Sequence, residues 1–155
     1  MTLLSALGLI LCSLNAQASV TSFATDGCTH FANGTHAQPT LWKQCCVLHD
    51  LAYWAGGNVE ALDEVDLNLR ECVASTGPRT IAEIMYWGIR LGHLSSHAIR
   101  GEQWGNAWSE TERRTTKLSV DEIDQLQNEL TQPNYDSVLE IGVRNAFIQQ
   151  LRNTN

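Results

Sequence analysis

The adjacent cysteines Cys45 and Cys46 constrain the fold of this chain more than any other feature. Neighbouring cysteines rarely bond to each other, because the closed ring would be strained, so each needs a partner elsewhere. Beyond the first twenty residues, the other cysteines are Cys28 and Cys72. An even number of cysteines in an exported protein indicates disulfides. Two disulfides would tie the segment around Cys45 to segments on both sides of it, and spacing alone leaves the pairing open.

The segment before these cysteines has the pattern of a secretory signal. Leu3 to Leu14 is apolar and uncharged, and Ala16 to Ala18 follows with the small-x-small pattern that signal peptidase reads. We therefore expect residues 1–18 to be a signal peptide, residues 19–155 to form one domain, and the protein to be secreted or periplasmic. The alternative is a membrane anchor, but the apolar run is well short of the roughly 20 residues that span a bilayer.

Composition excludes several classes of protein. The chain has 155 residues, of which 43% are hydrophobic and 17% are charged, so it can bury a real core and is not a disordered chain. It carries 10 Lys and Arg against 17 Asp and Glu, a formal charge of −7. Nucleic-acid binding depends on clustered basic residues, so we expect no nucleic-acid partner. Export also favours disulfides over a zinc site that would combine the cysteines with His30, His36 or His49.

The spacing of apolar residues predicts an all-α protein, and no strand alternation of any length is present. Gly56-Gly57 should end the first helix, and Asn58 is a candidate cap for the second. Ser119 and Glu122 form the pattern of a capping box. A short connection between the first two helices favours an antiparallel pair. The expected helices are residues 41–55, 59–76, 80–94, 119–130 and 136–151.

The candidate chemistry collects on this antiparallel pair. Trp42, Cys46, His49 and Tyr53 share one face of the first helix, with Asp50 beside them. In an antiparallel helix pair, residue numbers rise along one helix as those of the facing residues fall along the other. The two numbers of each facing pair therefore have a nearly constant sum. If Cys45 were bonded to Cys72, the same register would therefore place Asp66 against His49. A histidine held by a carboxylate is an oriented general base, and Asp50 would be free to bind a hard cation.

These residues also carry a resemblance to a known family. The string from Cys45 to Tyr53, CCVLHDLAY, matches the Cys-Cys-x-x-His-Asp-x-x-Tyr signature of the secreted calcium-dependent phospholipases A2. The spacing from Asp66 to Cys72 matches that family's second motif, and the two motifs occur in the expected order. The match covers residues 28–72, about a third of the chain. The chain therefore resembles a divergent, bacterial-type member of the family.

The resemblance implies a role for each matched residue. His49 is similar to the family's general base, Asp66 to the aspartate that orients it, and Tyr53 to the tyrosine that hydrogen-bonds that aspartate. Asp50 is similar to the side-chain ligand of Ca²⁺. The family's disulfides correspond here to Cys45 with Cys72 and Cys28 with Cys46. The implied fold is a phospholipase A2-like core, a disulfide-linked antiparallel helix pair, with additional C-terminal helices.

The calcium loop departs from the family's glycine-rich form. This chain has DGCTHFANGT around Cys28, with one cysteine and two isolated glycines. Aligned on Cys28, the loop offers the backbone carbonyls of Gly27, Thr29 and Phe31 as further calcium ligands. A backbone N–H near Gly27 or Gly34 is the expected donor to an oxyanion.

The expected activity is calcium-dependent hydrolysis of the sn-2 ester of glycerophospholipids by a water that His49 activates, giving lysophospholipid and fatty acid. The expected partner is a phospholipid membrane surface or micelle as substrate, and oligomeric state cannot be read from the sequence. Two alternatives remain open. One is a non-catalytic binding module with the same fold, and the other is a secreted helical structural or interaction protein in which the His49–Asp66 pair is merely structural.

The segment between Tyr86 and Trp108 holds three of the five tryptophans. Trp87 lies at helical spacing with Leu91, which is typical of a core position. Gly101 and Gly105 make the region around Trp104 and Trp108 a poor helix. We therefore expect Trp104 and Trp108 to face lipid or to line a pocket, because tryptophan favours the headgroup region of a bilayer.

Overall fold

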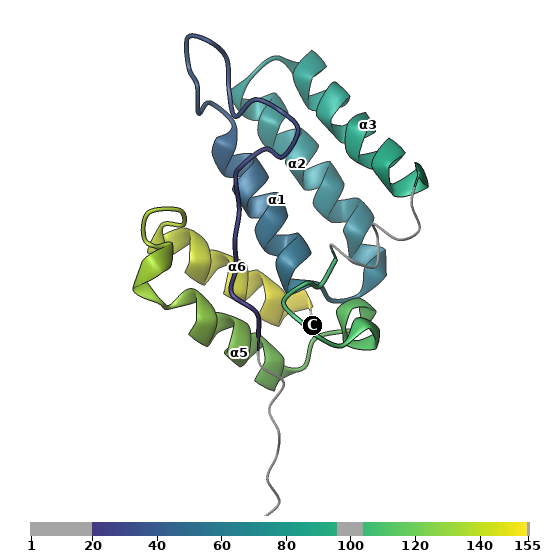
Figure 1. Cartoon of the computed structure of the whole chain (residues 1–155), viewed down its shortest axis with the longest axis vertical. Coiled ribbons are helices and arrows are strands. Elements are labelled where there is room, and N and C mark those ends of the chain that lie inside the picture. Colours follow the sequence, from purple (N-terminus) through teal and green to yellow (C-terminus); the bar gives the residue numbers. More distant parts are fainter. Residues whose placement is uncertain (1–19, 96–103, 155) are drawn as a thin grey trace, which may run out of the picture.

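The computed structural model describes residues 20–95 and 104–154. Across these two ranges the protein is all-helical, without strands, as predicted (Figure 1). Short 3₁₀ segments, Val59–Ala61, Thr111–Thr115 and Pro133–Tyr135, lie between the helices. The expected signal peptide lies outside the described residues. The α-helices are α1 (Lys43–Ala55), α2 (Leu62–Thr76), α3 (Arg79–Ser95), α5 (Val120–Leu130) and α6 (Ile141–Thr154).

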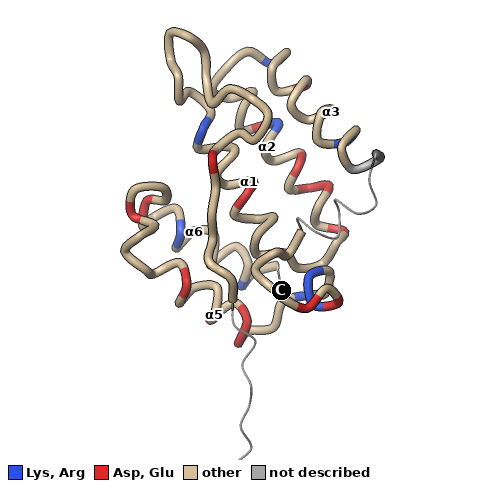
Figure 2. Tube along the Cα trace, in the orientation of Figure 1, with Lys and Arg blue, Asp and Glu red and all other residues tan. Residues whose placement is uncertain are grey.

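Helices α1, α2 and α3 lie side by side, with α2 in the middle (Figure 1). Both predicted disulfides are present: Cys28 bonds to Cys46, and Cys45 bonds to Cys72 across the α1–α2 interface. Ion pairs join α2 to α3, because Arg70 contacts Glu83 at 2.6 Å. Acidic residues are distributed along α2, and arginines lie on the neighbouring α3 (Figure 2). Disulfides therefore join α1 to the preceding loop and to α2, and ion pairs join α2 to α3.

The start of α2 differs from the prediction. Asn58 precedes a 3₁₀ turn over Val59–Ala61, its side chain makes no capping hydrogen bond, and the α-helix begins only at Leu62. The first helix begins at Lys43, two residues later than expected, and ends at Gly56 as predicted. Gly56 has φ +69°, and a side chain there would collide with the Cα of Gly105 at 2.5 Å. Glycine is therefore required where the end of α1 meets the segment after residue 103.

The second layer, α5 and α6, packs on the other side of α1. Its core joins apolar residues of α1 to those of the C-terminal helices, including Leu51, Trp54, Ile123, Leu126 and Ile148. The predicted capping box at the start of α5 is confirmed, since the Ser119 side chain accepts from the Glu122 N–H and the Glu122 carboxylate accepts from the Ser119 N–H. Helix α2 covers one side of α1, and α5 and α6 cover another. A pocket beside α1 can therefore form only on a side that neither layer covers.

The predicted start of α6 at Asp136 is wrong. The helix begins at Ile141, because Tyr135 and Leu139 are both buried in the core and hold the preceding segment in a turn. The N–H groups of Val138 and Leu139 both donate to the Tyr135 carbonyl. Arg144 of α6 is buried and contacts Asp136, which anchors the turn against the helix.

The expectations for the three tryptophans of the 86–108 segment are reversed. Trp104 and Trp108 are each 1% exposed, and their indole N–H groups donate to the carbonyls of Gly57 and Ala55. They hold the end of α1 in the core and do not face lipid. Trp87, for which a core position was expected, is 59% exposed on α3. None of the described helices has the length and apolar character that crossing a membrane requires.

Candidate active site

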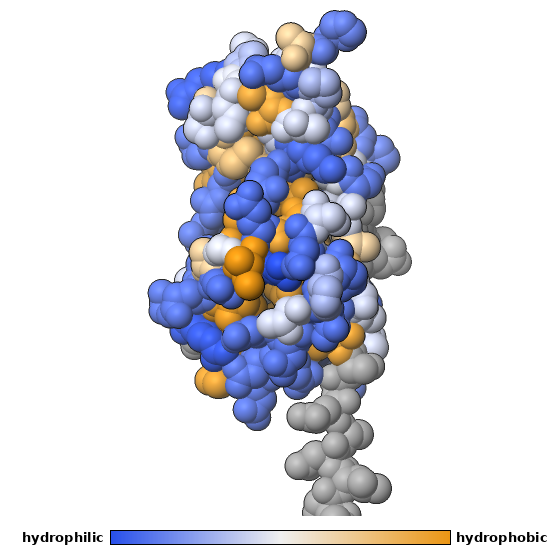
Figure 3. Space-filling model, turned by 90° about the vertical axis from the view of Figure 1, so that its left-hand side faces the viewer, coloured by the Kyte–Doolittle hydropathy of each residue, from blue (hydrophilic) through white to orange (hydrophobic). Residues whose placement is uncertain are grey.

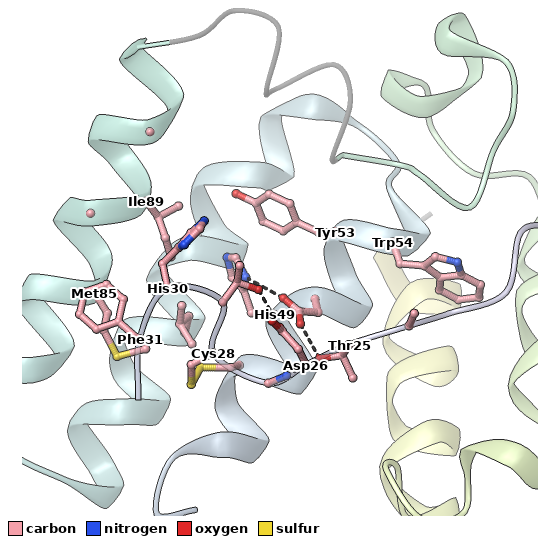
Figure 4. A pocket seen from close by; sticks show the side chains of 18 of the residues that line it. Thr25, Asp26, Cys28, His30, Phe31, His49, Tyr53, Trp54, Met85 and Ile89 are labelled. Carbon is pink, nitrogen blue, oxygen red and sulfur yellow. Dashed lines mark hydrogen bonds and ion pairs between the residues drawn. A yellow bond between two sulfur atoms is a disulfide. The ribbon is translucent and has the colours of Figure 1, made fainter. Parts of the chain in front are cut away.

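A pocket of about 770 Å³ opens between the loop before α1, α1 itself and α3 (Figure 4). The loop contributes residues 24–31 and α1 contributes His49, Asp50 and Tyr53. The α3 side is apolar, with Met85 and Ile89 beside Gly88 and Gly92. One wall is therefore polar and carries ionisable groups, and the opposite wall can hold an apolar chain.

The polar wall is built around a buried carboxylate. Asp66 of α2 is 0% exposed, and its Oδ1 accepts from the Tyr53 hydroxyl at 2.7 Å and contacts His49 Nε2 at 3.0 Å. His49 and Tyr53 lie one turn apart on α1, so both side chains reach the same atom of the neighbouring helix. A buried carboxylate that accepts a ring N–H holds the imidazole in one tautomer and one orientation.

Arg90 of α3 also contacts this carboxylate, and sequence reasoning did not find it. Its Nη1 lies 3.4 Å from Asp66 Oδ2 and also contacts Asp63. The available signal was an arginine among the apolar residues of the second half of α3, but its partner depends on how α3 packs on α2. Arg90 gives the buried negative charge of Asp66 a cationic partner, which such a charge requires.

The second ring nitrogen of His49 lies on the side of Asp50. His49 Nδ1 is 4.0 Å from Asp50 Oδ1, and both residues line the pocket. Burial of the imidazole disfavours its charged form and lowers the pKa, but the neighbouring carboxylates of Asp50 and Asp66 favour the charged form and raise it. The net result is a pKa of His49 above its ordinary value. The imidazole therefore has one nitrogen held by Asp66 and the other available as a proton acceptor beside the pocket.

The loop before α1 is shaped by hydrogen bonds that the motif did not predict. Asn33 Oδ1 accepts from the Cys28 N–H at 2.8 Å. Gly27 has φ +88°, and a side chain there would collide with the same Asn33 oxygen at 2.2 Å. The Thr25 hydroxyl donates to Asp50 Oδ2 at 2.5 Å, which ties the loop to α1. The role of Asn33 in holding the loop depends on the folded chain.

All the predicted site residues are brought to one place. The pocket is lined by Gly27, Thr29, Phe31, His49, Asp50 and Tyr53, while Asp66 lies behind His49. Gly34, the alternative oxyanion donor, does not line the pocket. The Gly27 N–H donates to Thr25 Oγ1 at 3.0 Å in this structure.

The oxygen-rich side of the pocket suits a hard cation. Within the two described ranges, no group of three or more His, Cys, Asp or Glu side chains could hold a metal ion. A cation at Asp50 would therefore need backbone carbonyl oxygens as further ligands, and the loop residues Gly27, Thr29 and Phe31 line the same pocket. Carboxylate and carbonyl oxygens are the ligands that Ca²⁺ prefers, so the residues present fit this ion.

Comparisons with known protein families, with curated proteins and with solved structures gave no match.

Proposed function

We propose that this protein is a secreted, calcium-dependent phospholipase A2 that hydrolyses the sn-2 ester of glycerophospholipids to lysophospholipid and fatty acid. The observation that carries the proposal is the contact of His49 Nε2 with the buried Asp66, which leaves Nδ1 beside Asp50 in a pocket with an apolar wall. The resemblance of residues 45–53 to the family signature agrees with it, and so does an all-α fold with the two implied disulfides.

In the proposed reaction, His49 acts as the general base. In neutral His49 the Nε2–H group donates a hydrogen bond to Asp66. The unprotonated Nδ1 then accepts a proton from water. The imidazolium that results is stabilised by the negative charge of Asp66, 3.0 Å away. Tyr53 holds the same carboxylate through its hydroxyl, so the base keeps its orientation while it gains and loses a proton. Water attacks the ester carbonyl directly, and the imidazolium returns the proton from Nδ1 to the departing glycerol oxygen as the sn-2 ester bond breaks, so lysophospholipid and fatty acid form without a covalent acyl-enzyme.

Asp50 and the loop carbonyls of Gly27, Thr29 and Phe31 would hold the calcium ion. When bound, Ca²⁺ supplies positive charge to the substrate phosphate and to the ester oxygen on which negative charge develops. The Cys28–Cys46 disulfide ties the loop that carries these carbonyls to α1, which supports the proposal. Asp50 is part of α1, one residue from His49, so the ligand and the base share one rigid helix.

The apolar wall of the pocket would receive an acyl chain. Phe31, Met85 and Ile89 line this side, opposite the ionisable residues of α1 (Figure 4). Burial of a chain against them removes apolar surface and water from the site. An ester at the boundary between the two walls would then lie near His49.

The test is release of fatty acid from phospholipid vesicles, measured with calcium and with a chelator. The expected result is calcium-dependent release that falls at least about a hundredfold in His49→Gln, the order of a general base's contribution. His36→Gln is the matched control, because His36 is exposed and outside the pocket. Asp50→Asn should lose both calcium binding and activity. Activity in His49→Gln equal to the wild type would exclude this mechanism.

One observation favours a second candidate, a binding module that does not use calcium. The Thr25 hydroxyl donates to Asp50 Oδ2, the carboxylate that a calcium ion would need. In a non-catalytic module this hydrogen bond would persist, and lipid would bind equally well with and without a chelator. Calorimetric titration with Ca²⁺ distinguishes the two candidates, because the enzyme is expected to bind the ion at Asp50 and the module is not.

A further inference from the structure

The outward face of α3 is an uninterrupted apolar stripe. Ile84, Trp87 and Leu91 are spaced by three and four residues, so they lie on one side of the helix. They are 56%, 59% and 62% exposed, respectively. We call these three residues the α3 stripe. Exposed apolar residues elsewhere, such as Val120 on α5 and Ile141 on α6, lie on separate helices.

The charged side chains of α3 turn away from this stripe. Glu83 and Arg90 form ion pairs with Arg70 and Asp63 of α2, and Arg79 lies 4.0 Å from Glu71. The pairing places charge on the flank of α3 that faces α2. The outward face is consequently uncharged, although the chain as a whole has a formal charge of −7.

The α3 stripe adjoins the mouth of the pocket. Gly88 lies between Trp87 and Ile89 and lines the pocket. A Cβ atom added to Gly88 would lie 3.6 Å from the Phe31 ring. Phe31 itself lines the pocket and is 39% exposed. Apolar residues therefore lead from the outside of α3, past Gly88 and the neighbouring Phe31, to Met85 and Ile89 in the pocket wall.

From this continuity we infer that the α3 stripe and Phe31 dock the protein on the surface of a zwitterionic lipid assembly, with Trp87 inserted at the headgroup level. The inference rests on the proposed function, since it names the surface from which that site draws its substrate. An indole favours the membrane interface, because it combines an apolar ring with one N–H donor. Acidic proteins are repelled by anionic surfaces, so an uncharged face of an acidic protein suits neutral headgroups.

The side of the molecule away from α3 has a different character. In Figure 3 hydrophilic side chains cover most of that side, and apolar ones show between them. Docking through α3 would instead turn the mouth of the pocket toward the lipid. A substrate molecule could then move into the pocket along apolar surface, without exposing its acyl chain to water.

The distribution of tryptophans permits a direct test. Trp87 is exposed, whereas Trp42, Trp54, Trp104 and Trp108 are all at most 5% exposed. Phosphatidylcholine vesicles with brominated acyl chains quench an indole that inserts among them. We expect them to quench the fluorescence of the His49→Gln protein, which binds without degrading the lipid, and the quenching to disappear in the His49→Gln, Trp87→Phe double variant.

Ile84→Ser tests the α3 stripe without removing the reporter, and Ile141→Ser is the matched control on α6, where Ile141 is 70% exposed. Ile84→Ser should weaken vesicle binding about tenfold, as the loss of one buried aliphatic side chain implies, and Ile141→Ser should leave it unchanged. On a monomeric short-chain phospholipid, Ile84→Ser should keep the wild-type rate.

If brominated lipid quenches Trp87 but the wild-type protein hydrolyses no ester, the docking inference is supported and the proposed function is refuted. Vesicle hydrolysis without quenching of Trp87, absence of vesicle binding, or a dimer that Ile84→Ser dissociates would each overturn the docking inference.

Discussion

Replacing Tyr53 by phenylalanine tests the buried network at its simplest contact. The change removes one oxygen, the donor to Asp66 Oδ1 at 2.7 Å. The ring itself should stay in place, because it packs with Leu62 and meets Trp104 edge-on with centroids 5.3 Å apart. The variant therefore isolates the hydrogen bond from the packing of the ring.

The magnitude follows from the burial of the acceptor. Asp66 is 0% exposed, so water has no access to replace the lost donor. A hydrogen bond to a charged group contributes about 1.5–3 kcal/mol to the free energy of unfolding, and we expect Tyr53→Phe to cost that amount. For a domain of about 135 residues, this corresponds to a fall in Tm of about 5–10 °C.

The assay is urea unfolding with the disulfides intact, followed by circular dichroism. Tyr86→Phe is the matched control, since Tyr86 is partly buried on α3 and its hydroxyl makes no hydrogen bond among the described residues. The control should change the free energy of unfolding by less than about 0.5 kcal/mol. In an Asp66→Asn background the effect of Tyr53→Phe should shrink to about 1 kcal/mol, because the acceptor is then neutral.

Equal stabilities of Tyr53→Phe and Tyr86→Phe would refute the reasoning. That result would mean that the Tyr53 hydroxyl is hydrated in solution or that Asp66 is not the buried charge around which the site is built.

Two further predictions concern the framework of the fold. Replacing both Cys45 and Cys72 by alanine opens a loop with a sequence separation of 27 and should cost about 3.5 kcal/mol on the loop-entropy model; chemical denaturation measures this, and an unchanged midpoint would contradict it. Burial raises the pKa of Glu122, but hydrogen bonds from Arg113 and Ser119 outweigh burial and hold it below its ordinary value. The stabilisation by Glu122 should therefore be fully present above the pKa of the unfolded chain and be lost as pH falls through the lower pKa of the folded protein. A stability difference between Glu122→Gln and wild type that stays constant on acidification would oppose this assignment.

Local patterns were sufficient for most of the helices and for the face of α1 that His49 and Tyr53 share. Helix α1 could be predicted because its apolar residues recur every three or four positions and two glycines follow it. His49 and Tyr53 share a face for the same reason. The resemblance to the family signature implied the two disulfides, and once Cys45 is bonded to Cys72, helical geometry brings Asp66 opposite His49.

The start of α6 and the surroundings of the tryptophans needed the folded chain. The sequence predicts a helix from residue 136, but burial of Tyr135 and Leu139 in the core holds residues 136–140 in a turn. Trp104 and Trp108 are buried because the end of α1 supplies two carbonyls that accept their N–H groups. An apolar pattern says that a residue prefers to leave water, but it does not say which surface will cover it.

The sequence by itself determined the helical class, the face of α1 that His49 and Tyr53 share, and the cysteines that fasten this helix. Only the tertiary structure decided that Arg90 shares the carboxylate of Asp66, that Asn33 holds the pocket loop, and that Trp87 remains exposed. The physical reason is the distance along the sequence over which each kind of interaction acts. Helical periodicity and motif spacing act over a few residues, whereas these contacts depend on how whole helices pack, and packing combines many weak interactions between segments distant in sequence.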